Sequence, residues 1–178
     1  MHANVINKGC VFHERVSSKR TLLLFVGLML LFAGLFFRNF FYTDHRGWGI
    51  TFGCISLFFL FYIFNYRVLV IQVGADELAL KFGIFTWHIP LDNIERCYID
   101  KTSLWRIGGA GIHFSPIGGR YRAMFNFLEY ERVVVCLKEK QGWVRDVAFS
   151  TTRPDEVMGL LMENTPSNRP PFCGEAAK

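Results

Sequence analysis

The residues best suited to molecular recognition are basic and aromatic, and they lie around a glycine-rich segment of the chain. Lys101, Trp105 and Arg106 precede this segment, and Arg120 and Arg122 follow the Pro/Gly turn SPIGG. Guanidinium groups match the geometry of phosphate oxygens, so these five residues are candidates for binding anionic lipid headgroups. The alternative is an ordinary solvated strand face, because acidic residues of the same region balance the basic ones.

Other groupings of reactive side chains match no catalytic pattern. The GGAG segment lacks both the Walker spacing and the dinucleotide-binding spacing, and β-branched and aromatic residues follow it instead of a helix. Close strand packing is the expected use of these glycines. The carboxylates Asp92, Glu95 and Asp100 have no accompanying nucleophile and are expected in turns and on the surface. We therefore expect no catalytic residue and a protein that is not an enzyme.

The spacing of histidines and cysteines predicts neither a metal nor a cofactor. His88 and His113 lie on different predicted strands, and neither has a partner at metal-ligand spacing. The five cysteines are widely scattered and form no C-x-x-C pair, as expected for reduced thiols in a cytosolic setting.

Two long apolar runs must position whatever the rest of the chain binds. They are TLLLFVGLMLLFAGLFF and GWGITFGCISLFFLFYIF, on either side of the polar hinge RNFFYTDHR. Neither run contains a charged side chain, and each is about long enough to cross roughly 30 Å of hydrocarbon as a helix. We expect an uncleaved transmembrane hairpin in contact with the lipid bilayer. The rival interpretation of the first run is a cleaved signal peptide, but no small-residue cleavage site follows it.

The net charge of +5 lies mostly beside these runs, since residues 1–20 carry +3 whereas residues 65–165 are neutral. Basic residues that flank membrane helices favour the cytoplasmic side of the membrane. We therefore expect a protein integral to the plasma membrane, with both termini in the cytoplasm. A neutral domain without an aromatic RNA-binding motif argues against a nucleic-acid partner.

Small residues within the apolar runs are candidates for helix packing. Gly27 and Gly34 share one face of the first predicted helix, and Gly49, Gly53 and Ser56 form a stripe on the second. Such stripes let two helix backbones approach closely. The residues are expected either to pack the hairpin against itself or to support a homo-oligomer.

Beyond residue 65 the hydrophobic pattern changes from helical to alternating. Leu78, Leu80 and Phe82 alternate with polar residues, and similar runs predict about seven short strands in all. Residues 152–164 predict an amphipathic helix that Thr152 caps.

The expected organisation has four parts. A membrane-embedded α-helical hairpin over residues 21–64 and an α+β domain over residues 66–164 are the folded parts. A loose cytoplasmic arm over residues 1–20 precedes them, and a disordered, proline-rich tail over residues 165–178 follows them.

Residues 66–163 resemble the bacterial PH-like (bPH) domain family, which occurs in small membrane proteins behind one or two helices. The resemblance rests on Ile89, Pro90, Leu91 and Ile94, on the glycines from Gly108 to Gly111, and on Pro154 at the start of the last helix. It implies a PH-like barrel or sandwich of about seven antiparallel strands, closed at one end by a C-terminal helix. No catalytic or binding residue is established for that family as a whole, so none is carried over.

These observations predict a non-catalytic binding or scaffolding module held at the bilayer, with another membrane protein as the expected partner. The alternative is a sensor of anionic lipid headgroups, and an enzyme acting at the membrane surface is the third hypothesis. Tethering supports a binding role because confinement at the membrane raises effective concentration.

Overall fold

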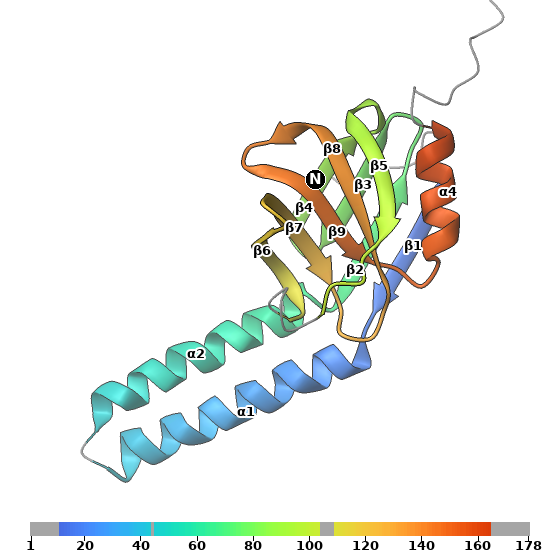
Figure 1. Ribbon diagram of the computed structural model, residues 1–178. Coiled ribbons are helices and arrows are strands. Elements are labelled where there is room, and N and C mark those ends of the chain that lie inside the picture. Colours follow the sequence, from blue (N-terminus) through green and yellow to red (C-terminus); the bar gives the residue numbers. More distant parts are fainter. Residues whose placement is uncertain (1–10, 44, 104–108, 165–178) are drawn as a thin grey trace, which may run out of the picture.

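The computed structural model describes residues 11–43, 45–103 and 109–164, which form a long helical hairpin and a domain of two β-sheets (Figure 1). The predicted binding residues Trp105 and Arg106 and the tail over residues 165–178 lie outside the described residues.

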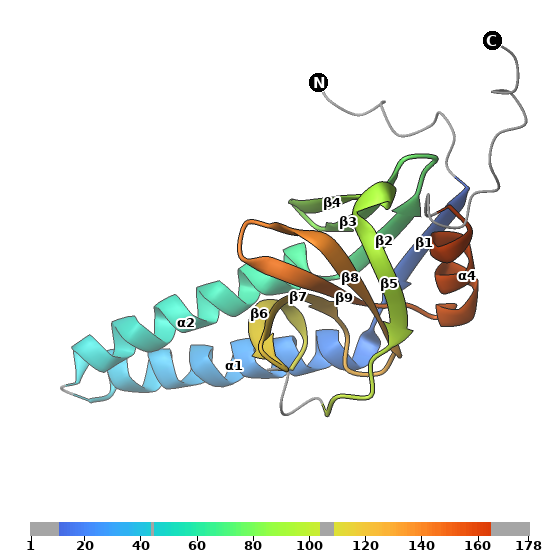
Figure 2. The same cartoon turned by 45° about the horizontal axis from the view of Figure 1, so that its top comes forward.

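The hairpin consists of α1 (Lys19–Phe41) and α2 (Arg46–Asn65), which pack side by side along their length (Figures 1 and 2). Both helices are long and apolar enough to cross a membrane. In the most apolar 18-residue segment of each helix, only 11% (α1) and 6% (α2) is buried. Ser18 begins α1 because its side chain accepts a hydrogen bond of 2.9 Å from the backbone N–H of Thr21. Two exposed apolar helices of this length are consistent with a membrane anchor.

Aromatic rings hold the two helices of the hairpin together. Phe32 on α1 stacks on Phe59 of α2 with ring centroids 5.8 Å apart, and Phe25 meets the ring of Tyr62 edge-on at 5.3 Å. Stacked and edge-on arrangements are the favourable geometries for such pairs. The abundance of phenylalanine in the apolar runs therefore serves helix packing as well as hydrophobicity.

The small residues of α2 contact α1, whereas the glycines of α1 do not contact α2. A Cβ atom on Gly49 would lie 3.0 Å from the backbone nitrogen of Phe40, and a Cβ on Gly53 would lie 3.0 Å from a ring atom of Phe36. The hydroxyl of Ser56 donates a hydrogen bond of 3.0 Å to the carbonyl of Met29. The α2 stripe thus packs the hairpin against itself.

The glycines of α1 do not share this role. A Cβ atom on Gly27 or Gly34 would meet nothing within 4 Å among the described atoms. Their expected use in hairpin packing is wrong, because the face that they share does not point at α2.

Nine strands form two sheets. In the first sheet the order is β1 (Phe12–Ser17), β2 (Val68–Val73), β3 (Glu77–Phe82) and β4 (Phe85–Pro90). After a 3-10 turn (Leu91–Asn93), the second sheet has the order β5 (Ile94–Ile99), β8 (Arg132–Gln141), β9 (Val144–Ser150), β7 (Arg120–Asn126) and β6 (Gly111–Ile117). The last described element is the helix α4 (Pro154–Asn164).

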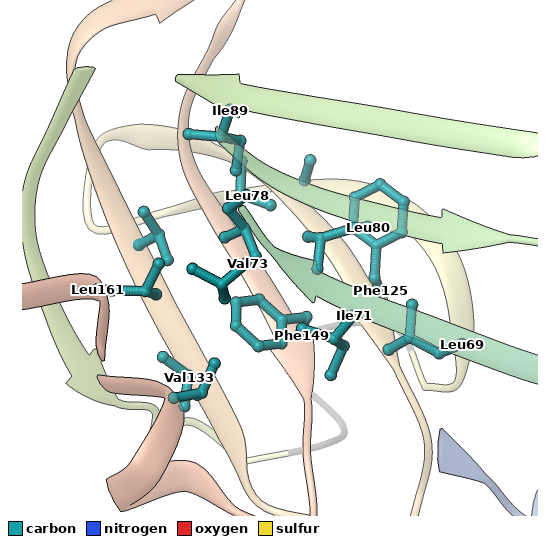
Figure 3. Close-up of a cluster of buried hydrophobic side chains, with 14 of the residues drawn as sticks. Leu69, Ile71, Val73, Leu78, Leu80, Ile89, Phe125, Val133, Phe149 and Leu161 are labelled. Carbon is teal, nitrogen blue, oxygen red and sulfur yellow. The ribbon is translucent and has the colours of Figure 1, made fainter. Parts of the chain in front are cut away.

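One hydrophobic core lies between the sheets. Leu78, Leu80 and Phe82 point into it and are fully buried, which confirms the predicted alternation of β3. Figure 3 shows side chains from both sheets meeting there, with Leu161 of α4 closing one end of the cluster beside Val133. The C-terminal amphipathic helix is thus confirmed.

The expected loose arm is wrong for residues 12–17, which form β1. Phe12 and Val16 are buried in the core, and β1 pairs antiparallel with β2 over its whole length. The period-two pattern was hidden because the residue between them on the buried face is Glu14, a charged side chain that is 6% exposed. In a sequence, a carboxylate at such a position indicates a residue that faces solvent.

The expectation of about seven antiparallel strands in a barrel also needs correction. There are nine strands among the described residues, β7 and β9 pair in parallel, and the two sheets remain open rather than closing into a barrel. Strand content and the hairpin of β6 and β7 across SPIGG are confirmed. Local alternation predicts strands, but it does not reveal which distant strands pair.

The hairpin is inserted between two neighbouring strands of one sheet. Only Ser18 separates β1 from α1, and only Tyr66 and Arg67 separate α2 from β2. Since β1 and β2 are paired residue by residue, the sheet domain and residues 12–17 lie at the same end of the hairpin. Short connections of this kind fix the orientation of the sheet domain relative to the helices.

Candidate functional site

The candidate site lies on the outer face of the second sheet, where β7 buries side chains that its sequence would place in solvent. Ala123 and Phe125 point into the core, whereas Arg122, Met124 and Asn126 point to the opposite face. All five are buried, and Arg122 is only 4% exposed. A charged side chain is buried to this extent only when it is paired.

Arg122 is surrounded by three acceptor side chains, two from β5 and the residue after it and one from β9. Its Nη2 donates a hydrogen bond of 2.9 Å to the hydroxyl of Tyr98 on β5. The guanidinium also forms ion pairs of 3.5 Å with the carboxylates of Asp100 and Asp146. The parallel pairing of β7 with β9 sets Arg122 opposite Asp146 in register, so the topology itself creates this contact.

Asp100 is held by a second arginine and by its own turn. Arg132 Nε lies 3.2 Å from one carboxylate oxygen, and the backbone N–H of Thr102 donates a hydrogen bond of 2.9 Å to the other. Burial alone would raise the pKa of the Asp100 carboxyl, but hydrogen bonds from Thr102 and from Arg132 outweigh burial and lower the pKa below its usual value. Asp100 therefore remains charged in the folded protein.

Arg120 links this cluster to the surface. Its Nε lies 3.1 Å from Asp146, and its Nη2 lies 3.7 Å from Glu95, which is half exposed. Arg120 itself keeps 29% of its side chain exposed. It is therefore the member of the cluster that reaches from the buried ion pairs to solvent.

The cluster borders a hollow of about 600 Å³. Four basic side chains and two acidic ones are among its lining residues, namely Arg96, Lys101, Arg120, Arg122, Asp100 and Asp146. The buried Nε of Arg122 has no hydrogen-bond acceptor among the described residues. The lining thus has an excess of positive charge and a spare donor, which suit an anionic or acidic group.

The Tyr98 hydroxyl and the Cys136 thiol at this site have pKa values shifted away from nucleophilic activation. Burial raises the pKa of Tyr98, an effect that the nearby Arg122 guanidinium only partly offsets, and burial also raises the pKa of the Cys136 thiol. Cys97 on the neighbouring strand has its pKa raised to about 12 by burial and by the nearby Cys136. Nucleophilic catalysis needs the opposite shift, toward the anion at neutral pH.

Among residues 11–43, 45–103 and 109–164, no group of three histidine, cysteine or acidic side chains is arranged to hold a metal ion. His88 lies 3.2 Å from Glu77, but both side chains are more than half exposed and neither lines the hollow.

Three of the five predicted binding residues meet at this hollow. Lys101, Arg120 and Arg122 all line it, whereas Trp105 and Arg106 lie outside the described residues. The expected solvated strand face is wrong for Arg122, because carboxylates cover its guanidinium.

The carboxylates Asp100 and Asp146 were missed as site residues. Asp100 was expected in a surface turn, and its burial depends on Arg132, which lies 32 positions further along the chain. One feature of the sequence could have identified Asp146. It is an acidic residue within the largely apolar strand sequence VRDVAFS, and such a residue predicts a buried partner of opposite charge.

Comparison of the chain with models of protein families, with curated proteins and with solved structures finds no match.

Proposed function

We propose that this protein is a non-catalytic binding module, anchored in the plasma membrane by its helical hairpin, with the sheet domain on the cytoplasmic side. The hollow beside Arg122 receives an acidic group of another membrane protein. The bPH-like resemblance of residues 66–163 agrees with such a role and is part of this proposal.

The observation that carries the proposal is the insertion of the hairpin between β1 and β2. A domain on a flexible linker would sample many orientations, whereas this domain is joined through Ser18 on one side and two residues on the other. Leu128 adds a third connection, since its N–H donates a hydrogen bond of 3.3 Å to the Thr21 hydroxyl of α1. A fixed orientation presents the hollow at a constant height above the bilayer, which favours recognition of a second membrane-bound molecule.

The mixed charge of the hollow favours a polypeptide partner. Asp100 and Asp146 occupy part of the guanidinium surface, so a bare phosphate would also face two carboxylates. An acidic side chain accompanied by backbone donors and acceptors matches a surface that presents both signs. The exposed Arg96 and Lys101 provide the first contacts with such a partner.

Binding of an anionic lipid headgroup is the second candidate function. It is favoured by the unpaired Nε of Arg122 and by the positive excess of the lining. The source of the acidic group, a protein or a lipid, is what the following experiment distinguishes.

A photoreactive amino acid placed at position 101 of the full chain, in the cells of origin, tests the proposal. We expect a discrete protein adduct, which weakens strongly when Arg96→Glu reverses the charge at the rim while leaving the buried ion pairs intact. The matched control carries the photoreactive residue at position 163, an exposed site on α4.

The outcomes separate the candidates. A protein adduct at position 101 alone supports binding of another membrane protein, and an adduct with a second copy of the chain identifies that partner as the protein itself. Lipid adducts that depend on Arg96 instead favour the headgroup function. Equal adducts at positions 101 and 163 contradict both.

The full chain is required because β1 belongs to the sheet. A fragment that begins at residue 66 would expose the core surface that Phe12 and Val16 cover.

A further inference from the structure

The two open sheets leave a seam between their edge strands β4 and β6, and aromatic side chains line it. Trp87 of β4 faces Phe114 of β6 with ring centroids 6.3 Å apart. Tyr121 and Trp143 extend the lining around a groove of about 360 Å³. We call these four residues the aromatic seam. Trp143 is 83% exposed and Phe114 is 51% exposed, which is unusual for side chains of this size.

The aromatic seam begins at the end of α2. Tyr66, the residue after α2, stacks on Phe85 at the start of β4 with ring centroids 6.2 Å apart. At the start of β6, a Cβ atom on Gly111 would lie 3.2 Å from the ring of Tyr62. Strands advance about 3.3 Å per residue, so Trp87 and Phe114 lie roughly 7 and 10 Å along their strands from these contacts.

The direction of the seam is fixed with respect to the hairpin. In both views the turn between β8 and β9, which carries Trp143, and the hairpin of β6 and β7 lie on the side of the domain that overhangs α2 (Figures 1 and 2). The helix α4 lies on the opposite side. The exposed aromatic rings are thus on the part of the sheet domain beside the end of the helices.

We infer that the aromatic seam rests in the interfacial layer of the bilayer, as a second membrane contact beside the hairpin. This inference depends on the proposed function, because it requires the hairpin to span that bilayer. Tryptophan and tyrosine prefer the boundary between headgroups and acyl chains, and the polar layers are only about 5–8 Å thick on each side. A seam that starts at the helix end therefore falls within reach of this layer.

The residues around Trp143 also suit contact with the interfacial layer of the bilayer. Lys140 and Arg145, both exposed, flank the turn on β8 and β9. Basic side chains at this depth meet lipid phosphates. Ile84, 70% exposed at the turn before β4, continues the apolar surface toward α2.

Fluorescence quenching in nanodiscs tests the inference on the full chain. Nanodiscs are made from phosphatidylcholine, either unmodified or brominated near the top of the acyl chains, and the contribution of Trp143 is obtained by difference from a Trp143→Phe variant. We expect brominated lipid to lower the Trp143 fluorescence by about twofold or more, because an indole ring at the interface lies beside the bromine atoms. A reporter on α4, Glu163→Trp in the Trp143→Phe background, should remain unquenched.

Trp48 makes failure of the inference distinguishable from failure of the anchor. It is exposed at the start of α2, and its contribution follows from a Trp48→Phe variant. Quenching of Trp48 without quenching of Trp143 would overturn the aromatic contact and leave the anchor standing. Quenching of neither would overturn both. A Trp143 that brominated lipid leaves unquenched and that aqueous iodide cannot reach would indicate a protein on the seam, which also overturns the inference.

Discussion

The carboxylate of Glu14 on β1 accepts a hydrogen bond of 2.9 Å from the backbone N–H of Thr152, which lies 138 positions away just before α4. The hydroxyls of Thr151 and Thr152 donate to the same carboxylate. The expected capping role of Thr152 therefore gives way to a tertiary contact. Through it, the strand that precedes the helical hairpin is connected to α4.

Replacing Glu14 with alanine should destabilise the protein. Thr151 is buried, and its hydroxyl and the Thr152 N–H would lose their acceptor, at a cost of about 1–3 kcal/mol. Thermal unfolding of the detergent-solubilised chain, followed by tryptophan fluorescence, measures this loss. Arg15→Ala, on the exposed face of the same strand, is the control. Equal midpoints for the two variants would contradict the role of Glu14.

Replacing Arg122 with alanine should cost more stability than any change at the rim of the hollow. The variant leaves Asp100 and Asp146 with Arg132 and Arg120 as their cationic partners among the described residues, so a loss of about 3 kcal/mol is expected, the lower end of the range for broken buried ion pairs. Arg96→Ala should change the unfolding free energy by less than about 0.5 kcal/mol. If Arg122→Ala unfolds like wild type, the ion pairs are not structural.

Acid should remove the stabilisation that Asp100 provides. Its folded-state pKa lies below the ordinary value of 3.8, so the charged form stabilises the fold above that pH, and the contribution is lost as pH falls through the lower, folded-state pKa. Denaturant unfolding of wild type and Asp100→Asn at pH 7 and at several values below 4 measures the difference. The wild-type advantage should shrink across this window, and a constant difference would contradict the assignment.

The glycines of the two apolar helices α1 and α2 should respond differently to substitution. Gly49→Val places a side chain against the backbone of Phe40 and should separate the helices and lower the unfolding temperature in detergent. Gly34→Ala adds a methyl group where the described structure has no neighbour within 4 Å. Its unfolding temperature should stay the same or rise, since alanine is the better helix former. A larger loss at Gly34 would show that another surface packs there.

Thiol reactivity should report the partial burial of Cys97 on β5. With its pKa raised to about 12, the Cys97 thiol is ionised in roughly one molecule in 10⁴ at pH 8, so maleimide should modify it slowly in the folded chain. Mass spectrometry of peptides after timed labelling measures the rate. Denaturation in detergent should accelerate labelling strongly, and a folded-state rate equal to the denatured rate would contradict the partly buried position of Cys97.

Local patterns in the sequence predict most elements of this fold but not their pairing. The charge-free runs predict the hairpin, and the alternation of Leu78, Leu80 and Phe82 predicts a strand with a buried face. The sequence pattern does not reveal β1, because the charged residue Glu14 occupies a core-facing position. Thr152, the hydrogen-bond partner of Glu14, is remote in the chain. Parallel pairing of β7 with β9 depends on contacts that no local period encodes.

The sequence predicts some of the basic residues of the candidate site, but it does not predict the ion pairs that they form. Arg120 and Arg122 were identified from their charge and their place after a turn, and the structure brings both to one hollow. Their partner Asp146 comes from a strand that becomes a neighbour only in the folded sheet. Charge balance over the whole domain predicted that acids neutralise bases, but the particular pairs depend on topology.

The insertion of the hairpin between β1 and β2 also imposes an order on synthesis. Chains emerge N-terminus first, so β1 leaves the ribosome before its pairing partner exists, and 50 residues from Ser18 to Arg67 intervene. The sheet therefore completes its first pairing only after both apolar helices have been made. The time needed to make the helices thus sets the earliest moment at which β1 can enter the sheet.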